Sequence, residues 1–494
     1  MILVALAMIA IIAMAALSID VITLYLAKLE AQRAADTAAV AAAKVIALSG
    51  LTGDPSNQSG NWALICGPDD GTKGLAARVA KATAAQNAVG GIAATSVTVT
   101  YAAGNGSSIG PGVPDCSTLA ASSGTPTAFG VNPIVNVQLT RTALPNFFSR
   151  IWGKAGTNIN ASASAEAFNP SNSGNVGNQT TGGPLTPVQP RCVKPWIVPN
   201  QDPLNPQPQG GIYCNQNGGP GPCQPITNLS NGSIMNPGVS TGGTGATGII
   251  GETFWLIADC RHNFSYCNLR TIAGIGVQPQ ANYSNNGGFI QQPPNLMYVP
   301  GQVTTPVIAV PSCSSGDDYE KAIEGCDQPT NYSCGVPPPG NNNIADLTRN
   351  PATPTSDGVQ CLIHQGNQSD LSEPTGQDYF NAFKFPTSYP FQIYAGSSNP
   401  LVTSGLPSGT PITTSASIVS LPIYDNSPPL TINSNTTTNV TFVGFLQVFI
   451  NAADNNGNVN VTVLNVAGCG NGSPPVGNPV TGNSPLPVRL ITPP

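Results

Sequence analysis

Charged side chains are scarce in this sequence. Asp, Glu, Lys and Arg make up 8% of its 494 residues, against roughly 25% in an ordinary soluble domain. The 17 Lys and Arg residues are spread thinly, so no basic stripe could neutralise a run of phosphates, and nucleic acid is excluded as an expected partner. Asn, Ser and Thr, with 54 Gly and 48 Pro, stand in place of charge, which is usual for secreted and cell-surface proteins.

Histidine is also scarce, with two residues, and the 12 cysteines contain no CxxC pair. A thiolate zinc site and a redox dithiol are therefore disfavoured, and we expect no metal and no cofactor. An even number of cysteines in such a chain predicts six disulfides formed in an oxidising compartment. Connectivity stays open, although the close neighbours Cys214/Cys223, Cys260/Cys267 and Cys326/Cys334 are candidate pairs. The expected disulfide cysteines are Cys66, Cys116, Cys192, Cys214, Cys223, Cys260, Cys267, Cys313, Cys326, Cys334, Cys361 and Cys469.

Catalytic patterns are missing as well: no GxSxG nucleophile turn is expected, and the chain has no HExxH, SxxK or phosphate-loop motif. His262 follows Cys260-Arg261, and His364 lies in "QCLIHQG" on an apparent strand. Neither histidine has a nucleophile and an acid in a known arrangement, so both are interpreted as structural or surface residues. The chain is predicted not to be an enzyme, and an exported hydrolase would need a cleft of converging acids that no motif announces.

Two polar clusters could be mistaken for calcium loops. Asp454, Asn456, Asn458 and Asn460 alternate like ligands, but Gly457 is misplaced for an EF-hand loop and no Glu follows at the twelfth position. Turn chemistry explains this run better. The second cluster, "GDDYE" at residues 316–320, is expected to be a solvated loop.

The first fifty residues carry the strongest signal. Residues 2–17 are unbroken apolar sequence, and the apolar run resumes at residues 21–27 after Ser18 and Asp20. Together they have about the length that crosses a bilayer as a helix. No charged segment precedes the run and no small-residue cleavage site follows it, so a cleavable signal peptide fits poorly.

The helix is expected to continue beyond the apolar run. Residues 24–48 are rich in Ala and contain no Gly or Pro, and they end at Ser49-Gly50, which predicts one helix of roughly 70 Å. Two interpretations remain open: a membrane anchor with a rigid stalk, or a pilin-type helix whose small residues pack against copies of itself. The lone acid Asp20 would either lie at the membrane interface or form an ion pair that sets helix register.

The segment "ALSIDVITLYLAKLEAQRAADTAAVAAA" at residues 16–43 resembles the N-terminal signature of Tad (tight-adherence, Flp-type) pilus proteins of the TadE/TadG-like family. Its Gln-x-Ala-Ala-Asp-x-Ala-Ala stretch departs at Arg33, which separates Gln32 from Ala34. The resemblance extends more loosely to Phe168, through "LPNFFSRIWG" (144–153) and "INASASAEAF" (159–168). It implies export, membrane insertion and a part in building or decorating a type IV-like pilus. The residues expected in helix packing and assembly are Asp20, Tyr25, Gln32, Arg33 and Asp36.

Two departures from related proteins are visible. No DxSxS loop of a von Willebrand A domain occurs, and Ala5 stands where many mature pilins carry Glu. We therefore expect a family member without a von Willebrand A domain.

The fold class is predicted to be α+β, with five segments. Residues 1–50 form the long helix, 51–168 a pilin-like α+β unit and 169–190 an Asn/Ser/Gly/Pro linker. Residues 191–400 form a Cys/Pro/Gly-rich β domain in which Trp196 anchors a small core, and 401–494 a β-strand domain that could be one with 191–400. Helix 74–89 and strands 95–101, 134–141, 158–168, 251–258, 305–310, 389–394, 415–424 and 439–451 are expected, the last opening a hairpin with Asn456-Gly457 in its turn. Cys469 is expected to fix the returning strand to the Cys-rich region.

The leading hypothesis is a structural, pilin-like component of a Tad-like pilus or surface filament. Its expected partners are copies of itself, other pilus components and the inner membrane before assembly, and its β-rich region would face the cell exterior. Two alternatives remain: a membrane-anchored periplasmic assembly factor, and an adhesin or glycan-binding tip with exposed aromatic residues around Trp196, Trp255 and Tyr266. The sequence does not separate a major subunit from a minor pilin or an anchored factor.

Overall fold

The chain divides into two compact units, which are described separately. The helix unit comprises residues 1–47, 56–168 and 488–494, and the barrel unit comprises residues 48–55 and 169–487. The computed structural model describes residues 2–49, 51–53, 62–71, 73–105, 108–120, 127–146, 148, 156–168, 188–206, 223–229, 232, 234–236, 240, 248–258, 295–313, 316–327, 329–335, 342–349, 351–365, 376–380, 393–412, 414–426, 437–455, 457–469, 480–482, 484 and 486–491.

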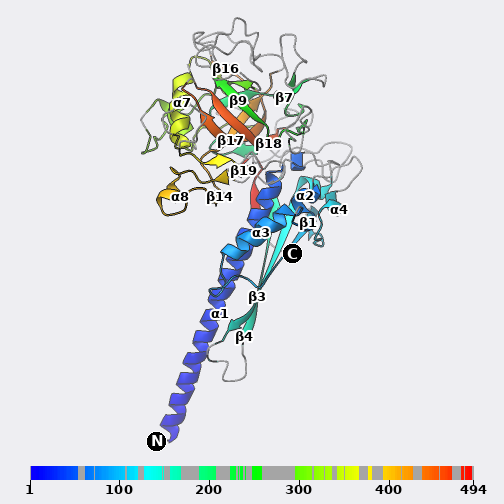
Figure 1. Cartoon of the computed structure of the whole chain (residues 1–494), viewed down its shortest axis with the longest axis vertical. Coiled ribbons are helices and arrows are strands. Elements are labelled where there is room, and N and C mark those ends of the chain that lie inside the picture. Colours follow the sequence, from blue (N-terminus) through cyan, green and yellow to red (C-terminus); the bar gives the residue numbers. More distant parts are fainter. Residues whose placement is uncertain are drawn as a thin grey trace. The chain divides into compact units, whose positions relative to one another are not determined.

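One uninterrupted helix, α1 (Ile2–Ala47), opens the helix unit and runs for 46 residues. Ala-rich sequence without Gly or Pro favours such a helix because every backbone N–H finds its carbonyl four residues back and Ala has the highest intrinsic helix propensity. The helix ends at Ala47, close to the stop predicted at Gly50. The expected long N-terminal apolar helix is thus confirmed, and Figure 1 shows it as the dark blue ribbon.

A five-stranded antiparallel sheet packs along the C-terminal half of α1 (Figure 1). Its order is β2-β1-β3-β4-β20, and α1 contacts mainly β3, β4 and the helix α3. The bounds are β1 (Ser96–Asn105), β2 (Ser108–Ile109), β3 (Pro133–Pro145), β4 (Gly156–Ala167), β20 (Val488–Ile491), α2 (Trp62–Cys66), α3 (Leu75–Gln86), α4 (Ser117–Ala120) and α5 (Ala128–Val131). The helix and three strands predicted here are confirmed. β20 comes from the region 401–494, which the sequence predicts to be a strand domain that could be one with 191–400.

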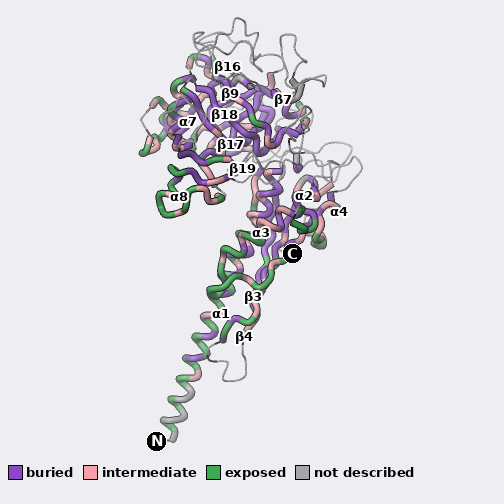
Figure 2. The backbone as a smooth tube through the Cα atoms, in the orientation of Figure 1, coloured by how far each residue is buried: buried purple, intermediate pink, exposed green. Residues whose placement is uncertain are grey.

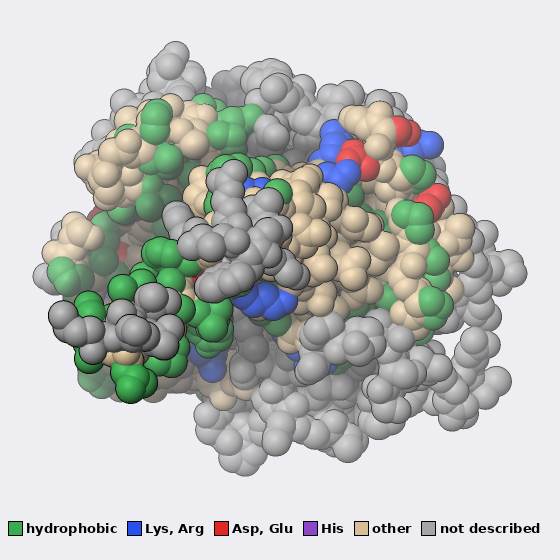
Figure 3. Space-filling view, turned by 90° about the horizontal axis from the view of Figure 1, so that it is seen from below, with side chains coloured by type: hydrophobic (Ala, Val, Ile, Leu, Met, Phe, Trp, Pro, Cys, Tyr) green, Lys and Arg blue, Asp and Glu red, His purple; other side chains and the backbone are tan. Residues whose placement is uncertain are grey.

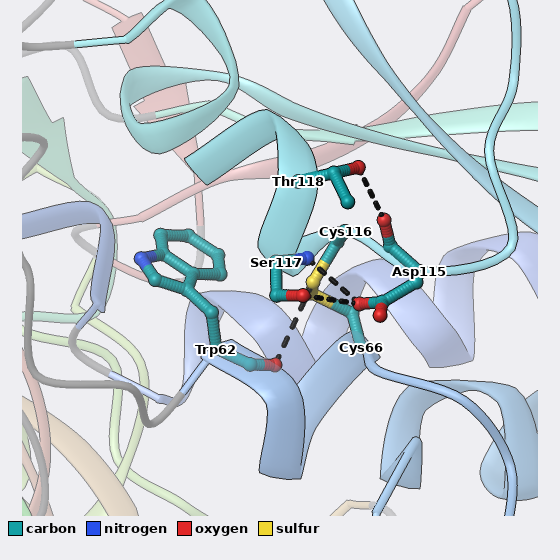
Figure 4. The surroundings of a disulfide bond; sticks show 6 residues. All are labelled: Trp62, Cys66, Asp115, Cys116, Ser117 and Thr118. Carbon is teal, nitrogen blue, oxygen red and sulfur yellow. Dashed lines mark hydrogen bonds between the residues drawn. A yellow bond between two sulfur atoms is a disulfide. The ribbon is translucent and has the colours of Figure 1, made fainter. Parts of the chain in front are cut away.

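A disulfide between Cys66 and Cys116 joins α2 to the start of α4. Around it, the Asp115 carboxylate accepts hydrogen bonds from the Ser117 amide (3.0 Å) and hydroxyl (2.6 Å), as Figure 4 shows. The indole ring of Trp62 packs against Phe129, with 5.2 Å between ring centroids. The disulfide and these contacts tie the short helices of this unit together.

The barrel unit is built around six strands that close into a barrel in the order β10-β6-β15-β17-β18-β9. Two neighbouring pairs, β6/β15 and β9/β10, are parallel, and the other four pairs are antiparallel. The strands are β6 (Trp196–Pro199), β9 (Thr253–Ala258), β10 (Asn295–Pro300), β15 (Ile418–Tyr424), β17 (Phe442–Ala453) and β18 (Val459–Gly468). The regions 191–400 and 401–494 therefore contribute strands to the same barrel.

Large apolar side chains fill the barrel core. Trp196 is fully buried and packs in one cluster with barrel residues such as Phe254, Leu296 and Leu446. Helices α6 (Asp318–Glu324) and α7 (Ala352–Leu362) contribute to the same cluster. The remaining elements are η1 (Leu51–Gly53), β5 (Val188–Pro190), β7 (Asp202–Pro206), β8 (Cys223–Gln224), β11 (Ile344–Asp346), β12 (Tyr379–Phe380), β13 (Ile393–Tyr394), α8 (Pro400–Thr403), β14 (Pro411–Ile412), β16 (Thr437–Asn439) and β19 (Val480–Gly482).

Three disulfides are described in the barrel unit: Cys192–Cys326, Cys313–Cys361 and Cys334–Cys469. The candidate pair Cys326/Cys334 is therefore wrong, because each of the two bonds a cysteine more than a hundred residues away. Cys334–Cys469 does join the end of β18 to the Cys-rich region, as expected. Cys214, Cys260 and Cys267 lie outside the described residues.

Two predicted strands are wrong. Residues 305–310 form no strand, and the segment has no ladder partner. "QCLIHQG" was expected on a strand, yet Gln360–Leu362 is the last turn of α7, and His364 follows with a φ of 59°. Three apolar residues are too few to distinguish a strand from a helix end. The hairpin β17–β18 is confirmed, and Gly457 in its turn has a φ of 79°.

Candidate functional site

The two halves of α1 have opposite surroundings (Figure 2). Large apolar side chains in the first half are exposed to between 42% and 82%. Figure 3 views the molecule from below, and hydrophobic side chains gather there on the side where Figure 1 places the N-terminus. The exposed residues are Leu3, Val4, Met8, Ile11, Ile12, Met14, Leu17, Ile19, Val21, Ile22, Tyr25, Leu26 and Leu29. By length and composition alone, α1 is a helix that could cross a membrane.

The second half of α1 buries a face made almost entirely of alanine. Its positions recur every three or four residues, which places them on one side of a helix. Because alanine is small, β3, β4 and α3 can approach the helix backbone closely. The buried residues of this alanine face are Ala27, Ala31, Ala34, Ala35, Ala38, Ala39, Ala42 and Ala43, each at most 2% exposed.

Polar side chains fasten the second half of α1 to its neighbours. The Gln32 amide donates to the Asp36 carboxylate (2.8 Å) and to the Ser162 carbonyl in β4 (2.9 Å). The Glu30 carboxylate accepts a hydrogen bond from the Gly90 amide, at 2.7 Å. Gly90 has a φ of 60° in the turn after α3, a conformation that glycine adopts without strain. Gln32 and Asp36, which the family resemblance linked to assembly, therefore make contacts within the chain.

Asp20 is the buried acid of the apolar half, with 3% exposure. Its two carboxylate oxygens lie 3.2 and 3.1 Å from the Phe148 backbone nitrogen and accept its N–H. Phe148 lies between β3 and β4, so the connection between these strands reaches α1 at this level. The two expectations for Asp20 were a position at the membrane interface and an ion pair with another helix. The structure adds a third role, since the carboxylate satisfies a backbone donor of the same chain.

The other two residues expected in assembly point outward. Tyr25 is 64% exposed and Arg33 is exposed. The structure thus gathers Gln32 and Asp36 at the sheet, holds Asp20 at the β3–β4 connection and leaves Tyr25 and Arg33 at the surface. That these five residues act in assembly remains a prediction.

The two polar clusters have structural roles. In the β17–β18 turn the Asp454 carboxylate accepts hydrogen bonds from the Asn458 amide (2.8 Å) and side chain (2.7 Å), and Asn456 lies outside the described residues. "GDDYE" is not a solvated loop, because Asp317 caps α6 by accepting the Glu320 N–H at 2.9 Å. Among the described residues, no three His, Cys, Asp or Glu side chains form a metal-binding group.

A GxSxG sequence and the aromatic residues of the adhesin hypothesis lie in positions that do not suit catalysis or glycan binding. Residues 106–110 have the form GxSxG, but Ser108 begins β2, an antiparallel partner of β1, rather than a strand-to-helix turn. The adhesin hypothesis expected exposed aromatic residues. Trp196 is instead fully buried and Trp255 is half-buried, while Tyr266 and His262 lie outside the described residues.

Sequence reasoning missed a buried lysine in the barrel unit. Lys194 is 3% exposed, and its ammonium group donates to the carbonyls of Ala322 (3.4 Å), Ile323 (2.6 Å) and Gly325 at the end of α6. Burial lowers the pKa of Lys194 to about 7, and the nearby Asp327 carboxylate opposes that shift. A cation at the C-terminus of a helix is favourable. The sequence carried no signal for this contact, because Lys194 and α6 are more than a hundred residues apart.

Comparison with known proteins locates one resemblance. Residues 1–45 match the family model described as putative Flp pilus-assembly TadE/G-like. The matched segment coincides with α1 and includes both its exposed apolar half and its buried alanine face. No curated protein and no solved structure matches the chain. The Tad-type signature seen in the sequence is thus confirmed over these residues, and its looser extension to Phe168 stays a prediction.

Proposed function

We propose that this chain is an exported structural component of a Tad-like pilus. The apolar half of α1, residues 2–29, would insert in the inner membrane and then pack in the filament. The barrel unit, with its disulfides, would face the exterior of the cell. The pilus-assembly family match over residues 1–45 supports a pilus-related role for the chain.

One observation carries the proposal: burial changes sharply along a single unbroken helix. Fully exposing apolar residues such as Leu3 and Ile12 to water is unfavourable, at roughly 1.5–3 kcal/mol for each large side chain. Their sustained exposure along α1 suits insertion into lipid or packing against other apolar helices. The alanine face is buried within the chain and is not available to other molecules. The exposed apolar side chains within residues 2–29 are therefore the surface that we assign to assembly.

The role is inferred to be non-enzymatic. The family that matches α1 is described by pilus assembly. The candidate residues of the helix unit make packing and backbone contacts, such as Asp20 with Phe148 and Gln32 with Ser162.

Filament shearing tests the proposal. Sheared filaments should contain the full chain, and deletion of residues 2–17 should abolish its incorporation while its disulfides still form. A matched replacement of residues 2–17 by a leucine-rich apolar segment should restore membrane retention. If the chain stays in the inner membrane and filaments are unchanged by its deletion, the structural role is wrong.

A membrane-anchored assembly factor is the second candidate. The observation in its favour is that Ala31, Ala35 and Ala38, which could have packed against other copies, are completely buried in the chain itself. Such a factor would remain in the cell envelope after shearing, and its deletion would reduce the number of filaments. The same fractionation therefore separates the two candidates.

A further inference from the structure

Two carboxylates lie buried together in the barrel unit. Asp202, at the start of β7, is completely buried, and Glu252, directly before β9, is 2% exposed. Burial, and then the Asp202 carboxylate beside it, raise the pKa of Glu252 well above its ordinary value. The two acids come from segments 50 residues apart and form no part of the proposed assembly surface.

Backbone and amide hydrogen bonds hold the two acids in place. Asp202 accepts the Leu204 N–H at 3.1 Å and the Asn236 side-chain amide at 3.0 Å. The Asn236 carbonyl accepts the Ile249 N–H at 2.9 Å, and the Ile249 carbonyl accepts the Glu252 N–H at 3.2 Å. This series of hydrogen bonds connects the two acids through Asn236 and Ile249. Two N–H donors therefore fix the position of the Asp202 carboxylate.

Glu252 has no N–H donor of this kind, and its side-chain contact is with Asp202 itself. Neither of its buried carboxylate oxygens has a hydrogen-bond partner among the described residues. Its neighbour Asp202, when ionised, is an acceptor and cannot donate to it. A buried carboxylate without a donor or a cation is costly, and buried charges are normally paired or bound to a metal. A protonated Glu252 can donate to Asp202, whereas an ionised Glu252 needs a cation beside it.

We propose that Asp202 and Glu252 bind a calcium ion. A proton shared between the two acids would leave one negative charge buried, whereas a divalent cation balances both. Carboxylate oxygens are the ligands that calcium prefers, and Glu252 has two of them unused. Backbone carbonyls and water would complete the six to eight oxygens that calcium takes.

The expected affinity matches an extracytoplasmic setting. Sites with few charged ligands in extracellular modules bind calcium with Kd values of about 10⁻⁴–10⁻³ M. Calcium would then stabilise the folded chain by mass action, because the unfolded chain has no preformed site. The inference concerns the barrel unit alone, so it holds or fails independently of the pilus assignment.

Thermal unfolding of the full chain in detergent tests the site. After removal of metal with EDTA, 5 mM CaCl₂ should raise the Tm by roughly 2–4 °C, and equilibrium dialysis with calcium should give about one ion per chain. Glu252→Gln should abolish both effects. Asp357→Asn, which removes an exposed acid from α7 in the same unit, should leave them unchanged.

Two results would overturn the calcium site. The wild type could fail to bind or respond to calcium while Glu252→Gln raises the Tm at neutral pH, which would mean a shared proton. Alternatively, Glu252→Gln could keep the full calcium response, which would place the ion elsewhere. Should Glu252→Gln fail to fold, Asp202→Asn with the dialysis measurement serves as the second variant, and retained binding of one ion would equally refute the site.

Discussion

The first and second halves of α1 are equally helical, yet their side chains differ in size and in burial. In the first half, large side chains such as Ile12 stand exposed, while in the second half small side chains such as Ala35 are completely buried. Helix formation depends on backbone geometry and propensity, which both halves satisfy. What differs is side-chain size: alanine lets β3 and β4 come close, and leucine or isoleucine would hold them away. One helix thus combines a segment whose large apolar side chains are exposed with a segment that packs inside its own domain.

Charge in the first half should have the largest effect. Met8 and Ile12 are 58% and 64% exposed, and the double variant Met8→Arg with Ile12→Arg should oppose insertion by about 5–7 kcal/mol, taking roughly 2.5–3.5 kcal/mol for each arginine. We expect the chain to leave the carbonate-resistant membrane fraction while its disulfides still form. The pair Met8→Leu with Ile12→Leu is the control. Retention of the arginine variant in the membrane would show that this half is not the inserted segment.

Overpacking in the second half should instead affect folding. Ala35 is completely buried in the half of α1 that packs against β3, β4 and α3, so Ala35→Leu should destabilise the helix unit by about 1–3 kcal/mol because the neighbouring elements must move away. A lower Tm in detergent, with unchanged membrane retention, is the expected result. Ala15→Leu places the same side chain at an exposed position of α1 and should change neither property. An equal Tm loss in both variants would contradict the division between the halves.

Much of this division could be read from the sequence, because it depends on local patterns. The apolar run, the Ala-rich continuation and the alternation in β1 and β4 act over a few residues, so periodicity and propensity predict them. The position of the apolar, exposed part of α1 could therefore be anticipated. One of the two open interpretations had small residues of this helix pack against other copies, and the buried alanine face is instead packed within the chain itself.

Contacts between distant segments could not be predicted. Phe148 meets Asp20 across 128 residues, and Cys334 bonds Cys469 across 135. The strand β20 joins a sheet whose other strands end at residue 167. Such pairings depend on the final three-dimensional packing and leave no periodic signal in the chain. The barrel closure and the Asp202–Glu252 pair escaped sequence reasoning for the same reason.

Asp20 is the buried acid of the first half, and its substitution should have an intermediate effect. Asp20→Ala leaves the Phe148 N–H without its acceptor and should cost about 1 kcal/mol, the usual net contribution of a hydrogen bond. Hydrogen exchange at the Phe148 amide should accelerate, and Asp20→Asn, which keeps an acceptor, should largely restore its protection. Slow exchange in Asp20→Ala would mean that the carboxylate does not hold the β3–β4 connection. Loss of pilus assembly in Asp20→Asn despite normal exchange would favour an ionic role between helices instead.

The smallest effect is expected where the second half meets solvent. Glu30 is exposed and accepts the Gly90 N–H at 2.7 Å, so Glu30→Ala should cost about 0.5 kcal/mol, at the low end for a hydrogen bond that water can replace. Exchange of the Gly90 amide should rise, because the turn after α3 loses its acceptor. Arg33→Ala, one helical turn away and also exposed, removes a side chain of similar exposure without touching this turn and should leave that exchange unchanged. If Arg33→Ala weakened filament incorporation while Glu30→Ala did not, the outer face of the second half would also take part in assembly, and the separation of roles along α1 would have to be redrawn around Arg33.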